Sequence, residues 1–87
     1  MGHADATVSL GVLYQNGTGV AQDYARALDL YQGPAAEGHA RAQNNLGLLY
    51  VRGTGVTQDY NHAAALFAES AAQGQVTAMR NLSVMYD

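Results

Sequence analysis

The chain contains no cysteine and no lysine, and it has one proline and one phenylalanine among its 87 residues. Without cysteine it forms no disulfide and holds no thiolate-bound metal. Its four arginines, the only side chains that stay cationic at every pH, stand far apart at positions 26, 41, 52 and 80. Nucleic-acid binding requires a basic stripe that neutralises phosphates, and these residues do not form one. We therefore expect no nucleic-acid partner.

Long apolar runs are also missing. No run reaches the roughly 18 residues of a membrane-spanning helix, and no basic-then-apolar signal segment opens the sequence. We expect no membrane insertion, and cytoplasm and periplasm both stay open as compartments. The composition, 48% hydrophobic and 13% charged with a net charge of −3, is typical of a globular protein. The length predicts a single domain over residues 1–87.

What the sequence does contain is a repeat with a period of 36 residues. Residues 17–24, GTGVAQDY, return 36 positions later as residues 53–60, GTGVTQDY. The Leu-Gly pair at 10–11 returns at 46–47, and returns as Leu-Ser at 82–83. A fixed period of this length indicates stacked two-helix units. The copies span about residues 5–40, about 41–76 and, as a partial third copy, about 77–87.

The first helix of each copy, the A helix, is predicted by apolar residues at positions i, i+4, i+7 and i+8, which form one face of an α-helix. The second copy places Ala42, Leu46, Leu49 and Tyr50 on that face. The equivalent core candidates are Ala6, Leu10, Leu13 and Tyr14 in the first copy and Ala78, Leu82, Met85 and Tyr86 in the third.

One position of the A helix holds only small residues: Gly11, Gly47 and Ser83. Glycine inside a helix costs about 1 kcal/mol relative to alanine. We expect a neighbouring helix to approach closely at this position, because a missing side chain leaves room for it.

The second helix, the B helix, follows a glycine-rich turn. Glycines in the turns 16–19 and 52–55 can adopt the left-handed conformation that closes a helix. Asp23 and Asp59 stand where a carboxylate caps the first-turn amides of the next helix. The core candidates of the B helices are Tyr24, Ala27, Leu30 and Tyr31, then Tyr60, Ala63, Leu66 and Phe67. Gly38 and Gly74 end these helices, so the fold class is all-α, with five helices in the order A-B-A-B-A.

The first B helix contains the pair Gly33-Pro34, whereas the second copy continues with Glu69-Ser70. Proline within a helix removes one backbone hydrogen bond and costs about 3 kcal/mol. This pair predicts that the first B helix bends or ends near Gln32. Two interpretations stay open, a plain kink and a functional hinge.

Residues 46–63, LGLLYVRGTGVTQDYNHA, place leucine, glycine, tyrosine and aspartate at fixed offsets. This pattern resembles the Sel1-like repeat, a relative of the tetratricopeptide repeat, and residues 6–40 match it equally well. The resemblance implies a right-handed α-solenoid of antiparallel helix pairs. It also implies a scaffold or adaptor, of a kind common in bacterial signalling, envelope and host-interaction proteins, and it implies no catalysis.

The sequence departs from the family pattern at three points. Leu30 and Leu66 stand where the family often has tryptophan, and Pro34 replaces a helical alanine. The cysteines of the cysteine-rich branch are absent. Any β-lactamase-like activity or β-lactam binding ascribed to that branch is therefore not carried over.

Candidate chemistry is sparse. The Gly-Thr-Gly turns lack the strand-loop-helix context and the lysine of a phosphate-binding loop. His3, His39 and His62 lack the spacing of a helical zinc site. We expect His39 to lie exposed in a loop and His62 to lie on the polar side of its helix. No nucleophile, base or acid grouping is evident, so we expect no catalytic residue, no cofactor, no metal site and no enzyme.

A candidate partner-binding surface lies on the outer face of the A helices, opposite the predicted core face, where Val8 and Gln15 also lie. Val12, Leu48 and Val84 are equivalent positions that form an apolar line. The surrounding residues that complete this predicted site are Asn44, Val51, Arg52 and Arg80. Aligned exposed apolar residues usually mark a contact. The alternative is that neighbouring A helices cover the line.

The sequence thus favours a module that binds a peptide or helix of a partner protein. The first alternative is a structural solenoid that dimerises or stacks end to end, because Met79, Leu82, Val84 and Met85 cannot all face inward on one helix. A hydrolase of cell-wall-related small molecules is a remote second alternative. Neither the partner nor the pathway is readable from these residues.

Overall fold

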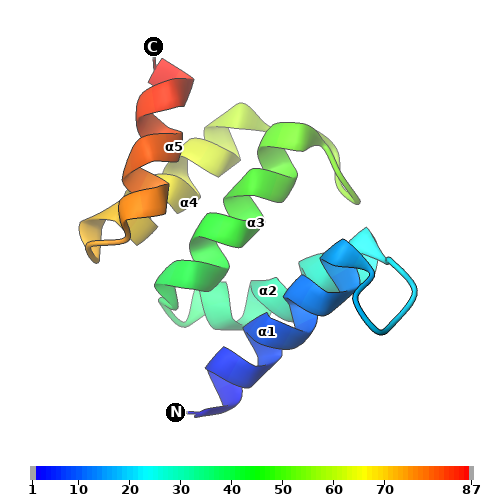
Figure 1. Cartoon of the computed structure of the whole chain (residues 1–87). Coiled ribbons are helices and arrows are strands. Elements are labelled where there is room, and N and C mark those ends of the chain that lie inside the picture. The colour runs from blue at the N-terminus through cyan, green and yellow to red at the C-terminus, as the bar shows by residue number, and fades with distance from the viewer. Residues whose placement is uncertain (1, 87) are drawn as a thin grey trace.

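The computed structural model describes residues 2–86, with side-chain surroundings for residues 3–85. This part of the chain forms five helices and no strand: α1 (Gly2–Asn16), α2 (Tyr24–Ala36), α3 (Ala40–Arg52), α4 (Tyr60–Ala72) and α5 (Val76–Tyr86). Each helix packs against the next, and the two termini lie at opposite ends of the array (Figure 1). The predicted A-B-A-B-A order is confirmed. Within residues 2–86, no helix is both long and apolar enough to cross a bilayer.

The glycine-rich turns close the A helices as predicted. Gly53 and Gly55 have φ angles of 66° and 75°, in the left-handed region where a Cβ is disfavoured. The Thr54 amide donates to the Leu49 carbonyl at 3.1 Å, which terminates α3 with a Schellman-type bond. The side-chain amide Nε2 of Gln58 donates to the Val51 carbonyl at 2.8 Å and holds the loop against the helix end.

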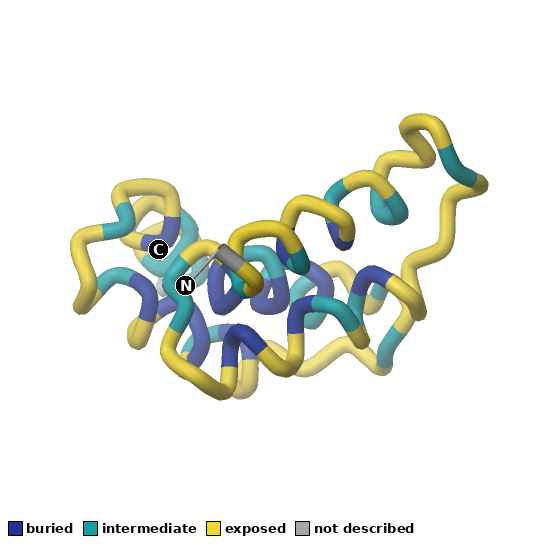
Figure 2. The backbone as a smooth tube through the Cα atoms, turned by 90° about the horizontal axis from the view of Figure 1, so that it is seen from below, coloured by how far each residue is buried: buried dark blue, intermediate teal, exposed yellow. Residues whose placement is uncertain are grey.

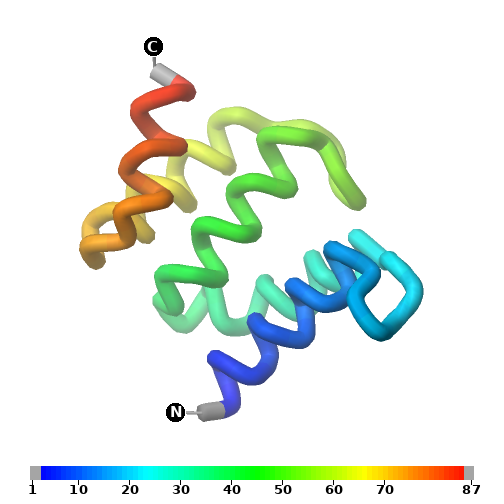
Figure 3. Tube along the Cα trace, viewed as in Figure 1, coloured from blue at the N-terminus to red at the C-terminus, as the bar shows by residue number. Residues whose placement is uncertain are grey.

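The loop after α3 also joins the two repeats. Its tip lies beside the start of α2 (Figure 3), where a Cβ on Gly55 would fall 2.8 Å from the Cβ of Tyr24. The B helices begin at the predicted caps. Asp23 Oδ1 accepts the Arg26 amide at 3.1 Å, and Asp59 Oδ1 accepts the His62 amide at 3.0 Å. Backbone and cap chemistry are therefore repeated in both copies.

The core is organised around two aromatic rings of the B helices, and buried residues gather between the helices (Figure 2). Tyr31 and Phe67 are fully buried. A Cβ on Gly11 would lie 2.6 Å from Tyr31 Cε1, and a Cβ on Gly47 would lie 2.7 Å from Phe67 Cε1. The expected close approach at this position is confirmed, and the aromatic ring is what approaches.

The predicted A-helix core face is buried in α3 but not in α1. Ala42, Leu46 and Leu49 are buried, whereas Leu10 and Leu13 are 41% and 39% exposed and Ala6 is exposed as well. α2 covers this face of α3, but in the described residues no helix precedes α1 to do the same. The core prediction for the first A helix is therefore wrong for Ala6, Leu10 and Leu13, whereas the predicted Tyr14 does pack against the core.

Val8 takes the place of these residues in the core. It lies on the side of α1 that meets α2, and its exposure is 0%, although the sequence pattern places it on the outer face. The A helix thus has two contact sides, one toward the preceding repeat and one toward its own B helix. In α1 only the second side is covered.

The expected end of α2 near Gln32 is wrong, because α2 continues through Pro34 to Ala36. Pro34 lies in the last turn, and its carbonyl accepts the amides of Glu37 at 3.1 Å and His39 at 3.0 Å, which close the helix. Gly33 has no Cβ to clash with the proline ring, so the residue before proline keeps a helical conformation. The ring is buried at the position that Ser70 occupies in α4.

His39 is not an exposed loop residue. It is the N-cap of α3, where its Nδ1 accepts the Ala42 amide at 3.3 Å. Its Nε2 lies 2.7 Å from Asp5 Oδ1 on α1, and its side chain is only 19% exposed. Both bonds are satisfied together by the neutral tautomer that carries its proton on Nε2. His39 thus connects α1 to the start of α3.

Candidate functional site

Four of the seven predicted partner-binding residues meet in one place. Leu48, Val51 and Arg52 of α3 face Val84 of α5 across a hollow of about 230 Å³, whose floor includes Phe67. A second, adjoining hollow of about 490 Å³ is lined by Val51, Val84, Tyr60 and Met85. We call the two together the α3–α5 hollow. Its full lining is Leu48, Val51, Arg52, Tyr60, Phe67, Asn81, Val84 and Met85.

The other three predicted residues lie elsewhere. Asn44 is only 5% exposed, and its Oδ1 accepts Asn81 Nδ2 at 2.9 Å, so this side chain joins α3 to α5. Val12 is half-buried and packs against the core. Arg80 is exposed and does not line the hollow, but it lies one helical turn before Val84 on the same face of α5. The predicted apolar line therefore contributes Leu48 and Val84 to the hollow and loses Val12.

The two complete repeats differ at two positions that bear on the hollow. In the first repeat the Tyr31 hydroxyl donates to Gln15 Oε1 at 2.7 Å. The corresponding residues of the second repeat are Phe67 and Val51, which line the α3–α5 hollow. The hydrogen-bonded pair Tyr31 and Gln15 of the first repeat thus corresponds to two apolar lining residues, Phe67 and Val51, in the second. Comparing the copies position by position would have found this signal.

Burial raises the pKa of the Tyr31 hydroxyl above its ordinary value, and the Arg41 charge and the Asn45 side chain lower it in part. A tyrosine with a raised pKa stays neutral at physiological pH and keeps its proton for Gln15. The first repeat therefore has a closed polar contact at the place where the second repeat has an apolar opening.

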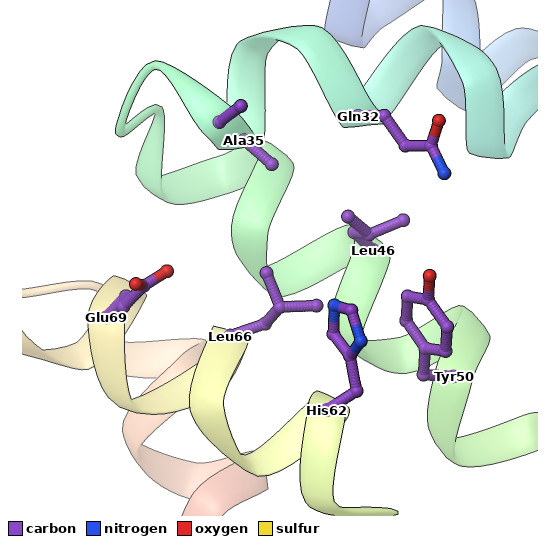
Figure 4. A pocket seen from close by; sticks show the side chains of 8 residues that line it. Gln32, Ala35, Leu46, Tyr50, His62, Leu66 and Glu69 are labelled. Atoms are coloured by element: carbon purple, nitrogen blue, oxygen red, sulfur yellow. The ribbon is translucent and has the colours of Figure 1, made fainter. Parts of the chain in front are cut away.

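A separate hollow, the α2–α4 hollow, lies between the two B helices (Figure 4) and measures about 270 Å³. Leu46 lies between the two helices there, and Gln32 comes from α2. His62 stacks on Tyr50 with ring centroids 4.2 Å apart and planes 13° from parallel, while Glu69 lies on the far side of Leu66. Stacking fixes the imidazole as a wall of the hollow.

Metal and cofactor chemistry finds no geometric support in the α2–α4 hollow. Among the described residues, no group of three or more histidines, cysteines or carboxylates lies close enough to hold a metal ion. His62 is exposed, in line with its predicted place on the polar side of the helix.

Antiparallel helix pairs stacked with a fixed period define an α-solenoid repeat protein, a class that offers extended surfaces to other macromolecules. The sequence model of the Sel1 repeat matches residues 4–38 and 40–75. The chain therefore belongs to the Sel1 repeat family, as its motif predicts.

Two solved structures agree with this assignment. The chain is 38% identical to a protective antigen of uropathogenic Escherichia coli with an SLR fold, at a TM-score of 0.93 over 98% of this chain. It is 32% identical to a Sel1 repeat protein from Oxalobacter formigenes, at a TM-score of 0.90 over 94% of this chain. It spans only 18% and 34% of the length of those two proteins. No curated protein matches the chain.

Proposed function

We propose that this chain is a protein–protein interaction module that binds a segment of a partner protein in the α3–α5 hollow. The observation that carries the proposal is the exposure of apolar side chains around a concave site. Val84 is 70% exposed and shares the hollow with Leu48, Val51 and Met85. Exposed apolar residues gathered in one hollow usually mark a contact with another molecule.

Membership of the Sel1 repeat family supports the same proposal, because Sel1 repeats generally serve as interaction scaffolds rather than catalysts. We assign no catalytic step to any residue. The predicted residues Leu48, Val51, Arg52 and Val84 form the centre of the proposed surface, and Arg80 lies at its edge.

The test is affinity capture from the native host with three variants. Val84→Glu and Leu48→Glu place a charge in the hollow and are expected to lose the partner that the unmodified chain retains. Ala65→Glu is the matched control, because Ala65 is exposed on α4 and the first repeat already has Asp29 at the equivalent position. Circular dichroism confirms that each variant keeps its helices. Equal capture by all four chains would contradict the assignment of the hollow.

A second candidate function is self-association through the ends of the array. Leu10 and Leu13 are exposed at the first helix, and Val76 and Met79 are exposed at the last. Repeat arrays need neighbouring units to cover such faces. None of these four residues lines the α3–α5 hollow, although Val76 shares a face of α5 with Arg80 and Val84.

A further inference from the structure

The charges of the chain are sorted between its helices. α3 and α5 carry Arg41, Arg52 and Arg80 and no carboxylate among their described residues. The B helices and their caps carry a single arginine, Arg26, and five carboxylates: Asp23, Asp29, Glu37, Asp59 and Glu69. The side of the molecule formed by α3 and α5 is therefore cationic although the chain as a whole is acidic.

One arginine of this side lines the apolar hollow, and the other two lie on the helix faces that lead to it. Arg41, Leu48 and Arg52 stand at i, i+7 and i+11 on α3, so they share one face of the helix. At a rise of about 1.5 Å per residue, the two arginines lie about 16 Å apart along that face, with the leucine between them. Arg52 itself lines the hollow, and Arg80 follows the same face of α5 as Val84, one turn away.

No carboxylate lines either part of the hollow. Asp59, the acid next in sequence to Tyr60, has its carboxylate held by the His62 amide as the cap of α4. Asp5, the acid of α1, is paired with His39. Within residues 3–85, neither Arg52 nor Arg80 forms an ion pair with a carboxylate, and an anionic ligand would meet uncompensated positive charge there.

We propose that the α3–α5 hollow selects an acidic protein segment, one that places an apolar side chain among Val51, Val84 and Met85 and carboxylates against Arg52 and Arg80. This inference rests on the proposed function and names the chemistry of its partner. The apolar part supplies burial, and the carboxylates supply charge-assisted hydrogen bonds to guanidinium groups. Specificity then comes from the lack of carboxylates in the lining, because a basic segment would meet the charges of Arg52 and Arg80.

The test uses two fluorescently labelled peptides and the full chain. In the first peptide, glutamates flank two leucines, and in the second, glutamines replace every glutamate. Fluorescence anisotropy is expected to give the glutamate peptide an affinity about tenfold higher than its glutamine counterpart, as expected for complementary charges. Added salt should lower the affinity of the chain for the glutamate peptide and leave its affinity for the glutamine peptide unchanged, because salt screens exposed charge pairs.

Three variants locate the site. Arg52→Glu with Arg80→Glu is expected to lower the affinity for the glutamate peptide by about tenfold or more, and Val84→Gln is expected to weaken both peptides. Arg26→Glu is the control, because Arg26 lies on α2 with its guanidinium 5.4 Å from the centre of the Tyr14 ring, away from the hollow. The Arg26→Glu variant should bind both peptides with the affinity of the unmodified chain.

Failure of this inference is distinguishable from failure of the proposed function. Equal affinities for both peptides, lost in Val84→Gln, would overturn the acidic preference and leave the hollow as a binding site. Binding of the glutamate peptide that survives Arg52→Glu with Arg80→Glu would also overturn the inference, as would a lack of binding by both peptides. The proposed function fails separately, when partner capture from the host is indifferent to Val84→Glu.

Discussion

Each of the helices α1 and α3 has a glycine at the position where an aromatic ring of the following B helix packs against it. Gly47 lies against Phe67, and an added Cβ would come within 2.7 Å of the ring. Ser83 stands at the same position of α5, where no B helix follows among the described residues. Replacement by alanine should therefore have opposite effects on stability at Gly47 and at Ser83.

We expect Gly47→Ala to lower the free energy of unfolding by about 1–3 kcal/mol, because overpacking of the ring outweighs the gain in helix propensity. Ser83→Ala should be neutral or stabilising by about 0.5 kcal/mol. Urea denaturation followed by circular dichroism measures both. A stabilising effect of Gly47→Ala would mean that the two helices separate easily at this contact.

A second residue-scale prediction concerns the polar pair of the first repeat. Removing the Tyr31 hydroxyl leaves Gln15 without its partner, and removing the Gln15 amide leaves the hydroxyl buried without an acceptor. Each of Tyr31→Phe and Gln15→Val should cost about 1 kcal/mol. The double variant, which copies Phe67 and Val51, should cost about 1 kcal/mol less than the sum of the single variants. Additive losses would show that the two side chains are not coupled.

The same tyrosine predicts a pH dependence. Its pKa is raised in the folded state, so the folded chain holds this proton more tightly than the unfolded chain does. The stabilisation is complete below the ordinary pKa of tyrosine, about 10, and is lost as the pH rises through the higher folded-state pKa. The difference in unfolding free energy between the unmodified chain and Tyr31→Phe should therefore shrink above about pH 10. A difference that stays constant in this range would contradict the assignment to Tyr31.

At the scale of the helix, His39 has two structural roles, and a different residue stands at the equivalent position of the second repeat. It caps α3 and contacts Asp5 of α1, whereas Gln75 holds the corresponding position before α5. His39→Ala should cost about 1 kcal/mol, chiefly through the lost cap. Asp5→Ala should cost no more than about 0.5 kcal/mol, because its carboxylate is exposed and surface ion pairs contribute little. Thermal melts of both variants test this ranking, which equal losses would refute.

At the scale of the whole molecule, the first and last described helices both expose apolar side chains. The face of α1 with Leu10 and Leu13 corresponds to the face of α3 that α2 covers, and Val76 and Met79 are exposed on α5. Burial of a few hundred Å² of such surface contributes several kcal/mol at about 25 cal/mol per Å². Covering these faces with another helix would therefore stabilise the described helices.

We expect light scattering at micromolar concentration to give a mass above that of one chain, and Leu10→Glu or Met79→Glu to return it toward the monomer. Ala65→Glu is the control, because Ala65 is exposed on α4 and lies on neither end helix. A stable monomer of the unmodified chain at these concentrations would rule out self-association through the ends.

Much of the fold was predictable, because its signals are local. Helix periodicity, the left-handed glycines and the Asp23 and Asp59 caps each depend on residues within one or two turns, and each is confirmed. The position of Pro34 in a final turn depends on where the helix ends, which the proline penalty alone does not determine. The cap role of His39 depends on the ring reaching both the Ala42 amide and a carboxylate 34 residues earlier.

The sequence by itself determined the repeat, the five helices, the turns and the family, because these follow from spacing along one chain. Only the tertiary structure decided which faces are covered and where the hollow lies. Leu10 and Leu46 are both leucines at the same position of the repeat. Leu10 is exposed and Leu46 is buried, because burial depends on a neighbouring helix. Likewise Leu48 and Val84 lie 36 positions apart on different helices, and only the packing of α3, α4 and α5 brings them together beside Phe67.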